Sequence, residues 1–155
     1  MNEASQPLEW PAQVERVCLA RGLTLTPLRR RVLMAIAQAP APLGAYAILD
    51  ALASGGQKRP APPTVYRALE FFLAHGFLHR IESRNAYARC EHIGHSHAGI
   101  LMVCGRCGRS DEAENAAMER LLAEVCASAG FAVEARVVEL QGLCRACAKF
   151  APARP

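Results

Sequence analysis

Two Cys-x-x-Cys pairs constrain the second half of this chain more than any other feature of the sequence. The first pair is Cys104 and Cys107, the second is Cys144 and Cys147, and 36 residues separate them, which is enough for a helix and a strand. Each such turn can direct two thiolates toward one point, and two turns complete a tetrahedral site for Zn²⁺. We therefore predict a closed, structural zinc site that supplies folding free energy to a domain with a small core.

A redox-active dithiol is the alternative interpretation of either pair, but a thioredoxin-like site needs only one CxxC, at a strand-to-helix junction. The chain has seven cysteines and no apolar stretch long enough to cross a membrane. Its first ten residues contain two acidic residues and no apolar run, unlike a secretion signal. We expect a cytoplasmic protein whose cysteines bind metal or carry redox chemistry rather than form disulfides.

The first half of the chain has the pattern of helices followed by a hairpin. Apolar residues recur at helical spacing in four segments; Thr26-Pro27 marks the start of the second, and Gly76 ends the fourth. Two short β-rich runs flank the turn at Ser83-Arg84-Asn85. The expected helices cover about 14–21, 27–39, 44–53 and 62–75, and the expected strands cover 77–82 and 86–90. This order predicts a winged helix-turn-helix domain.

The second half changes type. We expect an apolar strand at 99–104, a helix from Asp111 to about Ala129 and a strand at 131–140, before the last CxxC turn. The prediction is an α+β chain in which a winged helix-turn-helix domain (1–88) precedes a small α/β domain with the four-cysteine zinc site (89–155). Residues 1–86 hold ten basic and six acidic residues, whereas 87–155 hold eight of each. The whole excess charge lies in the first domain and hints at an anionic partner there.

A second group of metal-type side chains is expected where the two domains join. The turn of the 77–90 hairpin would bring His79 opposite Cys90 or one residue away, and the strands flanking the first CxxC would bring His97 near Glu112. Four ligands from these positions would tie the domains together, and the ionised Cys90 and Glu112 would neutralise a divalent cation. His95 is a competing ligand, and solvated histidines with a core cysteine are the alternative. Thiolate, imidazole and carboxylate together suit Zn²⁺ better than Mn²⁺ or Fe²⁺, although copper would bind at least as tightly.

The motifs Leu25-Thr26-Pro27-Leu28-Arg29 and Pro63-Thr64-Val65-Tyr66-Arg67-Ala68-Leu69, with the two CxxC pairs, resemble the ferric uptake regulator superfamily of bacterial metal-responsive repressors. The likeness covers about residues 12–149 and is strongest to the zinc uptake regulator branch, because His79, Cys90, His97 and Glu112 are similar to its regulatory site. It implies a cytoplasmic homodimer, paired through the second domain, with one structural and one regulatory Zn²⁺ per chain. Such a dimer binds double-stranded operator DNA with an inverted repeat and represses metal-uptake genes. No membrane and no small-molecule substrate is expected.

The same resemblance places Tyr66 and Arg67 in the family's recognition helix, and Tyr46 at a further DNA-contacting position. We expect Arg67 to contact bases, because a guanidinium pairs bidentately with guanine. Thr64, Tyr66 and Tyr46 are expected to touch phosphate or sugar. Arg29, Arg30 and Arg84 would add electrostatic contacts.

The alternative classes of function are an enzyme, a thiol redox sensor and a regulator that responds to another metal. An enzyme is not expected, because the chain has no Ser/His/Asp set, no phosphate-binding loop and no HExxH motif. A thiol redox sensor would use one CxxC pair as its switch and release zinc on oxidation. A regulator of the same fold that responds to iron, manganese or nickel is argued against only by the ligand chemistry.

Overall fold

The computed structural model of the protein describes residues 9–54, 58–93, 99–134 and 136–150. The chain divides into two compact units, Met1–His95 and Ser96–Pro155. Helices and two small three-stranded sheets make up the described residues, so the expected α+β architecture is confirmed. No helix among these residues is both long and apolar enough to cross a membrane.

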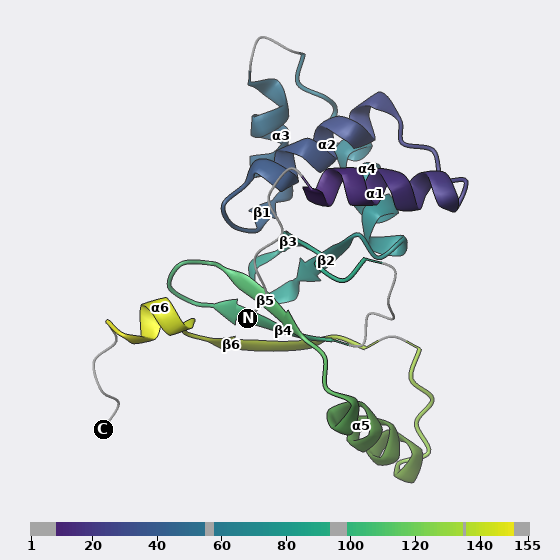
Figure 1. Ribbon diagram of the computed structural model, residues 1–155, viewed down its shortest axis with the longest axis vertical. Helices are drawn as coiled ribbons and strands as arrows, with labels where there is room; N and C mark the ends of the chain where they lie inside the picture. Colours follow the sequence, from purple (N-terminus) through teal and green to yellow (C-terminus); the bar gives the residue numbers. More distant parts are fainter. Residues whose placement is uncertain (1–8, 55–57, 94–98, 135, 151–155) are drawn as a thin grey trace. The chain divides into compact units, whose positions relative to one another are not determined.

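Four helices form most of the first unit and lie on one side of a small sheet (Figure 1). Thr26 caps the second helix as predicted, since its side chain accepts a hydrogen bond from the backbone N–H of Arg29 at 3.3 Å. The first helix is longer than expected, because it begins five residues before Val14 and includes Trp10. The helices are α1 (Glu9–Ala20), α2 (Pro27–Gln38), α3 (Ala45–Ala53) and α4 (Pro62–Ala74).

The sheet of the first unit has the strand order β1-β3-β2, all antiparallel. The predicted hairpin is present as β2 (Leu78–Ile81) and β3 (Ala86–Arg89), joined by a 3-10 turn and by Asn85 in the left-handed region (φ +46°). The two-residue β1 (Leu43–Gly44) pairs with β3 and was not predicted. Together with α2, α3 and α4, these strands complete the winged helix-turn-helix.

The core of the first unit is built from one apolar stripe of each helix and from the inner face of the hairpin. The stripe of α4 is the predicted one: Val65, Leu69 and Phe72 are almost fully buried. Trp10, Val14 and Cys18 of α1 join the same core. The opposite face of α4 is therefore exposed, and its side chains are available for contacts outside the core.

The second unit is a sheet with the strand order β5-β4-β6, in which β4 (Ile100–Cys104) pairs antiparallel with β5 (Ser110–Ala113) and parallel with β6 (Val138–Gly142). Two expectations are wrong here. Residues 111–113 are strand, and the helix α5 (Ala116–Ser128) begins later, where the Asn115 side chain caps it. The last strand begins at Val138 rather than at Phe131.

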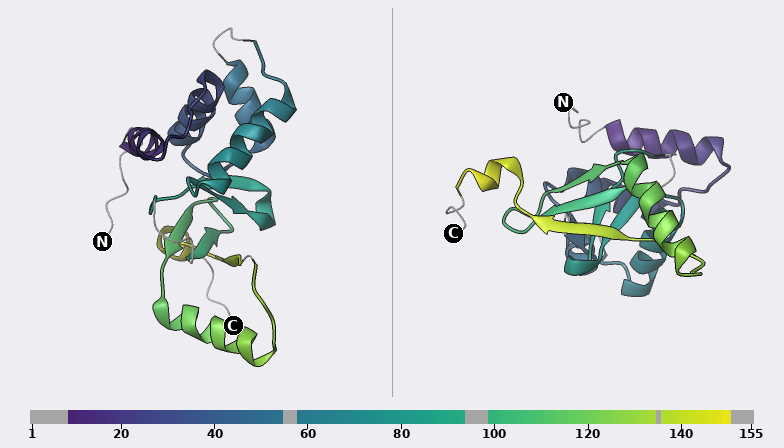
Figure 2. Two further views of the ribbon diagram at one scale, coloured as in Figure 1. Left: turned by 90° about the vertical axis from the view of Figure 1, so that its right-hand side faces the viewer. Right: turned by 90° about the horizontal axis from the view of Figure 1, so that it is seen from below.

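Apolar side chains of the second unit lie largely outside its small core. The described residues of this unit bury only Leu101, Val103 and Cys104 among the hydrophobics, and α5, which stands apart from the sheet (Figure 2), buries none. Leu121 and Val125 on α5 are 58% and 56% exposed. Also exposed are Met102, Phe131, Val133, Val137, Leu140, Leu143 and Phe150. A single copy of this unit therefore leaves an extensive apolar surface uncovered.

Candidate metal centres

The four CxxC cysteines are brought together by the ends of three elements. Cys104 ends β4, Cys107 lies in the turn that follows, and Cys144 precedes the short helix α6 (Arg145–Ala148), which carries Cys147. Gly108 closes the first turn with φ +78°, a conformation that favours glycine, and its N–H donates to the Cys104 carbonyl at 3.0 Å. The 36 residues between the pairs return to the same point because β6 runs alongside β4.

The geometry of this four-cysteine cluster fits a zinc ion. All four Sγ atoms lie within 4.8 Å of one another. A tetrahedron with Zn–S bonds of about 2.3 Å has S–S edges of roughly 3.8 Å. The Sγ atoms of Cys107 and Cys144 are 3.8 Å apart. The four thiols could therefore hold Zn²⁺ with little rearrangement.

Electrostatics in the cluster favour ionised sulfur at one position and oppose it at another. Backbone N–H groups of Cys107 and Cys144 donate to the Cys104 thiolate and lower its pKa to about 5. Desolvation and the neighbouring thiols raise the pKa of Cys147 to about 12. Four thiolates this close repel one another, so their simultaneous ionisation requires a bound cation.

Arg106, inside the first CxxC turn, ties the two turns together. Its Nη1 donates to the backbone carbonyl oxygens of Cys147 and Phe150, each at 3.3 Å. The backbone N–H of Gly105 also donates to the Gly142 carbonyl at 2.8 Å. These bonds hold the second CxxC against the first without using any thiol.

Separate from the four-cysteine cluster, the first unit contains two further side chains of a metal-binding type, His79 and Cys90. The predicted register, with His79 opposite Cys90 or one residue away, is wrong. His79 lies opposite Ala88, two residues from Cys90, and the Cys90 N–H donates to the Phe77 carbonyl at 3.0 Å. His79 and Cys90 are nevertheless diagonal neighbours on the same face of the hairpin, since side chains alternate with a period of two. Their ligand atoms lie within 4.8 Å of each other.

The other two proposed regulatory ligands belong to the second unit. Glu112 is half-buried on β5, opposite Leu101 of β4. Its carboxylate lies over Gly99, where a Cβ atom would come within 2.9 Å of Oε1. His97 lies outside the described residues, as does the competing candidate His95.

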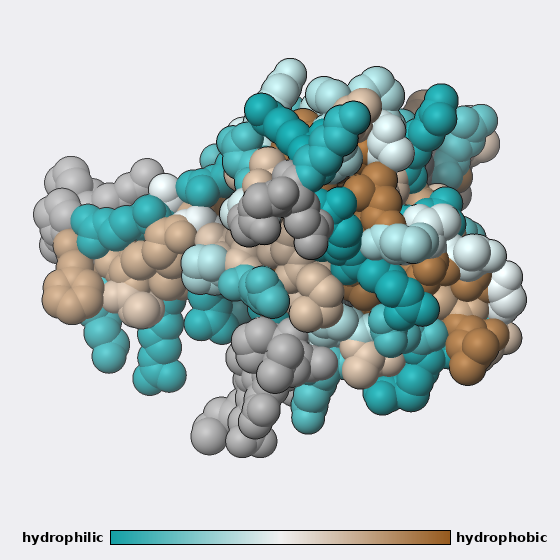
Figure 3. Space-filling view, turned by 90° about the horizontal axis from the view of Figure 1, so that it is seen from above, coloured by the Kyte–Doolittle hydropathy of each residue, from teal (hydrophilic) through white to brown (hydrophobic). Residues whose placement is uncertain are grey.

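The side chains expected to contact DNA are exposed on α3 and α4. Thr64, Tyr66 and Arg67 lie on the side of α4 opposite its buried stripe, and Tyr46 in the first turn of α3 is 69% exposed. Figure 3 views the molecule from above and shows groups of hydrophilic side chains interspersed with separate hydrophobic patches. The exposed hydroxyl and guanidinium groups of these four side chains can donate hydrogen bonds to phosphate oxygens.

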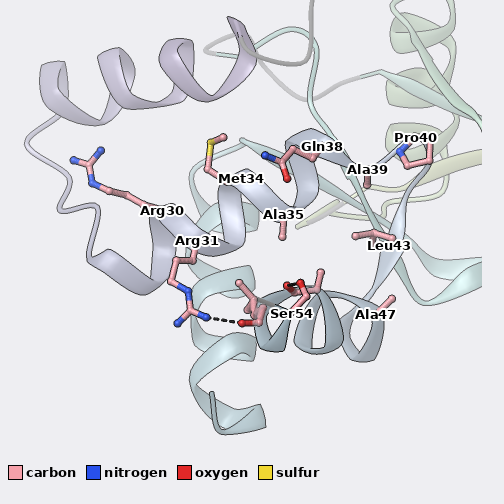
Figure 4. Close-up of a pocket in the computed structure, with 12 residues that line it drawn as sticks. Arg30, Arg31, Met34, Ala35, Gln38, Ala39, Pro40, Leu43, Ala47 and Ser54 are labelled. Carbon is pink, nitrogen blue, oxygen red and sulfur yellow. Dashed lines mark hydrogen bonds between the residues drawn. The ribbon is translucent and has the colours of Figure 1, made fainter. Parts of the chain in front are cut away.

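The arginines of α2 have structural partners in addition to any role in binding. Arg29 lies 3.6 Å from the centre of the Phe71 ring and donates to the Thr24 carbonyl at 2.6 Å. Arg30 pairs with Glu15 of α1. Figure 4 shows Arg31 reaching across the groove between α2 and α3, where its Nη2 donates to the Leu52 carbonyl at 2.6 Å. These bonds orient α1 and α3 against α2.

One contact near Cys90 could not be anticipated from the sequence. The indole Nε1 of Trp10 donates to the Cys90 carbonyl at 2.9 Å, in a buried position. Neither periodicity nor motif spacing signals a hydrogen bond between residues 80 positions apart. Only the packing of α1 beside the end of β3 brings the two residues together.

Comparisons with known proteins agree with one another. Residues 20–141 match the model of the ferric uptake regulator family. The zinc uptake regulation protein of Escherichia coli (strain K12) is 36% identical over 153 residues, covering 98% of this chain and 89% of its own length. A zinc uptake regulator solved with zinc and DNA has a TM-score of 0.83 at 37% identity, covering 95% of this chain and 98% of that chain. The structure of holo XcZur has a TM-score of 0.82 at 40% identity, covering 91% and 98%.

Proposed function

Because the chain belongs to the ferric uptake regulator family, we propose that it is a zinc-responsive repressor that binds operator DNA in the cytoplasm and controls metal-uptake genes. It is a regulator of transcription and not an enzyme. The observation that carries the proposal is the likeness, over nearly the whole length of both chains, to a zinc uptake regulator solved with zinc and DNA. The nine-in-ten coverage of the curated relative extends that likeness beyond a single shared domain.

Two zinc ions per chain are proposed, with different roles. The four-cysteine cluster has no position left for water and would act as a structural site. The regulatory site would take His79 and Cys90 from the first unit, and His97 and Glu112 from the second. The ion bound there would supply a fixed positive centre shared by ligands of both units. If all four residues bind the ion, two from each unit, the shared ligation would limit how far the two units can separate.

In the proposed complex α4 enters the major groove, with its N-terminal turns nearest the bases. Arg67 would pair with guanine, while Thr64, Tyr66 and Tyr46 would position the helix through phosphate or sugar contacts. All four side chains are exposed in the structure. The buried stripe of α4 fixes the helix that carries Thr64, Tyr66 and Arg67 to the core, whereas Tyr46 lies on α3.

Arg67→Ala should weaken operator binding by about 5- to 150-fold, equivalent to roughly 1–3 kcal/mol for one bidentate base contact. Binding to random DNA should change much less, because phosphate contacts dominate there. Fluorescence anisotropy with both DNAs at one salt concentration measures this. Arg16→Ala removes the same charge from an exposed site on α1 and is the matched control. Equal losses on operator and random DNA would show that Arg67 contacts only the backbone.

A homodimer is proposed from the uncovered apolar surface of the second unit. With α5 burying none of its own apolar face, a second copy of the chain is the partner that would cover Leu121 and Val125 on both sides of a twofold axis. Two DNA-binding domains related by that axis match the two halves of an inverted repeat.

Leu121→Glu should weaken the dimer without unfolding it, because the side chain is already exposed in one copy of the chain. The loss of one buried leucine, about 1.5–3 kcal/mol, corresponds to at least a tenfold rise in the dimer dissociation constant. Sedimentation equilibrium measures the constant, and circular dichroism checks the fold. Ala123→Glu places the same charge on the other side of α5 and should leave the dimer intact. Dimers of Leu121→Glu as tight as the wild type would place the interface elsewhere.

The proposed function is tested by operator binding at controlled free-metal concentrations. Purified protein that retains its structural zinc should bind the operator tightly when free zinc is added, and weakly when free zinc is held low by a chelating buffer. Iron, manganese or nickel restoring binding at lower free concentration than zinc would contradict zinc as the signal. Binding that follows thiol oxidation rather than metal would favour a redox sensor instead.

A further inference from the structure

The only tryptophan of the chain is used to hold the backbone of a proposed zinc ligand. Trp10 is 3% exposed, in the first turn of α1, and its Nε1–H donates to the carbonyl oxygen of Cys90 at 2.9 Å. A buried indole N–H costs free energy unless it has an acceptor, and so does a buried carbonyl without a donor. The bond therefore satisfies both groups and fixes where α1 meets the end of β3.

The Cys90 backbone is fixed on both sides. Its N–H donates to the Phe77 carbonyl at 3.0 Å, and its C=O accepts from Trp10. The residue is fully buried. With both of these backbone groups held, the position of Sγ depends mainly on the single torsion about the Cα–Cβ bond. This leaves the thiol near the ring nitrogen of His79.

We propose that Trp10 is a positioning residue of the regulatory zinc site, which holds the Cys90 thiolate in place through its backbone. The inference rests on the proposed function, in which Cys90 binds the regulatory zinc. Hydrogen-bonded groups that orient metal ligands commonly change metal affinity by about 10- to 100-fold when they are lost. Trp10 bonds to the peptide carbonyl of Cys90 and not to its thiol, so it would act on this ligand through the backbone. It makes α1, which carries no proposed zinc ligand, part of the sensor.

Trp10→Phe tests this, because phenylalanine keeps an aromatic ring in the core but has no N–H to donate. We expect a roughly tenfold lower affinity for zinc at the regulatory site, measured by competition with a chelator on protein that retains its structural zinc. With Co²⁺ as a probe, saturated Trp10→Phe should still show the thiolate-to-cobalt absorption band, reached at higher free Co²⁺. A structural role alone would not move the metal affinity of a protein that remains folded.

Val14→Ala is the matched control for stability. Val14 is fully buried on the same helix, and its truncation leaves a cavity but removes no hydrogen bond to the Cys90 peptide. It should lower the melting temperature while changing zinc affinity less than twofold. Equal loss of affinity in Val14→Ala and Trp10→Phe, or no loss in Trp10→Phe, would overturn the proposal. Cys90→Ser distinguishes a failure of the proposed regulatory site from a failure of the role of Trp10. If Cys90→Ser binds the second zinc as tightly as the wild type, the proposed regulatory site is wrong, and the role of Trp10 is wrong with it.

Discussion

Cys104→Ser is expected to lose the structural zinc and with it the folded second unit. Structural zinc in small domains contributes apparent binding free energies of about 10–16 kcal/mol at neutral pH. Whole proteins of this size are stable by only about 5–15 kcal/mol. Since the described part of the second unit buries few apolar residues, its core cannot replace the zinc contribution. Zinc content should fall by one ion per chain, and the dimer should dissociate in sedimentation experiments.

Cys126→Ser is the control for the loss of a thiol in the same unit. Cys126 is half-buried on α5 and does not belong to the four-cysteine cluster. It should keep the zinc content, the dimer and the circular dichroism of the wild type. A folded, dimeric Cys104→Ser protein would contradict the structural role of the cluster.

Cys90→Ser is expected to separate sensing from folding. The variant should dimerise and keep one zinc per chain, because the four-cysteine cluster lies in the other unit. It should need on the order of 100-fold more free zinc for half-maximal operator binding, since a neutral hydroxyl replaces one of two anionic ligands proposed for the regulatory site. Anisotropy across a buffered zinc series measures the shift.

Cys18→Ala is the control in the same unit. Cys18 is buried in the core, where desolvation raises the pKa of its thiol, so it behaves as a small apolar side chain. Its zinc response should match that of the wild type. An unchanged response in Cys90→Ser would remove Cys90 from the regulatory site.

Elements with strong local signals were predictable from the sequence. Thr26-Pro27 marked the start of α2, and the apolar stripe of α4 gave both its existence and its buried face. The hairpin followed from its turn, and the four-cysteine cluster from the two CxxC spacings. In each case residues close in sequence, or a fixed chemical spacing, carried the information.

The second unit was less predictable, for a physical reason. Its helix and last strand expose apolar residues, so their periodicity does not follow a core within one chain. Residues 111–113 carry no strand signal of their own, because β5 is short and half-buried, and only its pairing with β4 makes it a strand. An apolar surface that is covered only by a second copy of the chain gives a weak periodic pattern in the sequence of one copy.

Contacts between residues far apart in the sequence could not be predicted either. The pairing of Leu43 with Tyr87 and the bond from Trp10 to Cys90 join positions far apart in sequence. The hairpin register placed Cys90 two residues from its expected partner, yet the alternation of side chains preserved its closeness to His79. The chemistry of the pair could be predicted, whereas its geometry could not.

The most direct test of the account compares one wild-type protein in two states of zinc loading. Operator affinity is measured with one zinc per chain and with two, at the same ionic strength. We predict at least tenfold tighter binding with two, within the range of about 1–3 kcal/mol typical of coupling between sites, and an equal gain in zinc affinity when operator is present. Identical operator affinity in the two states would contradict the account and leave a zinc-stabilised DNA-binding protein without a sensor.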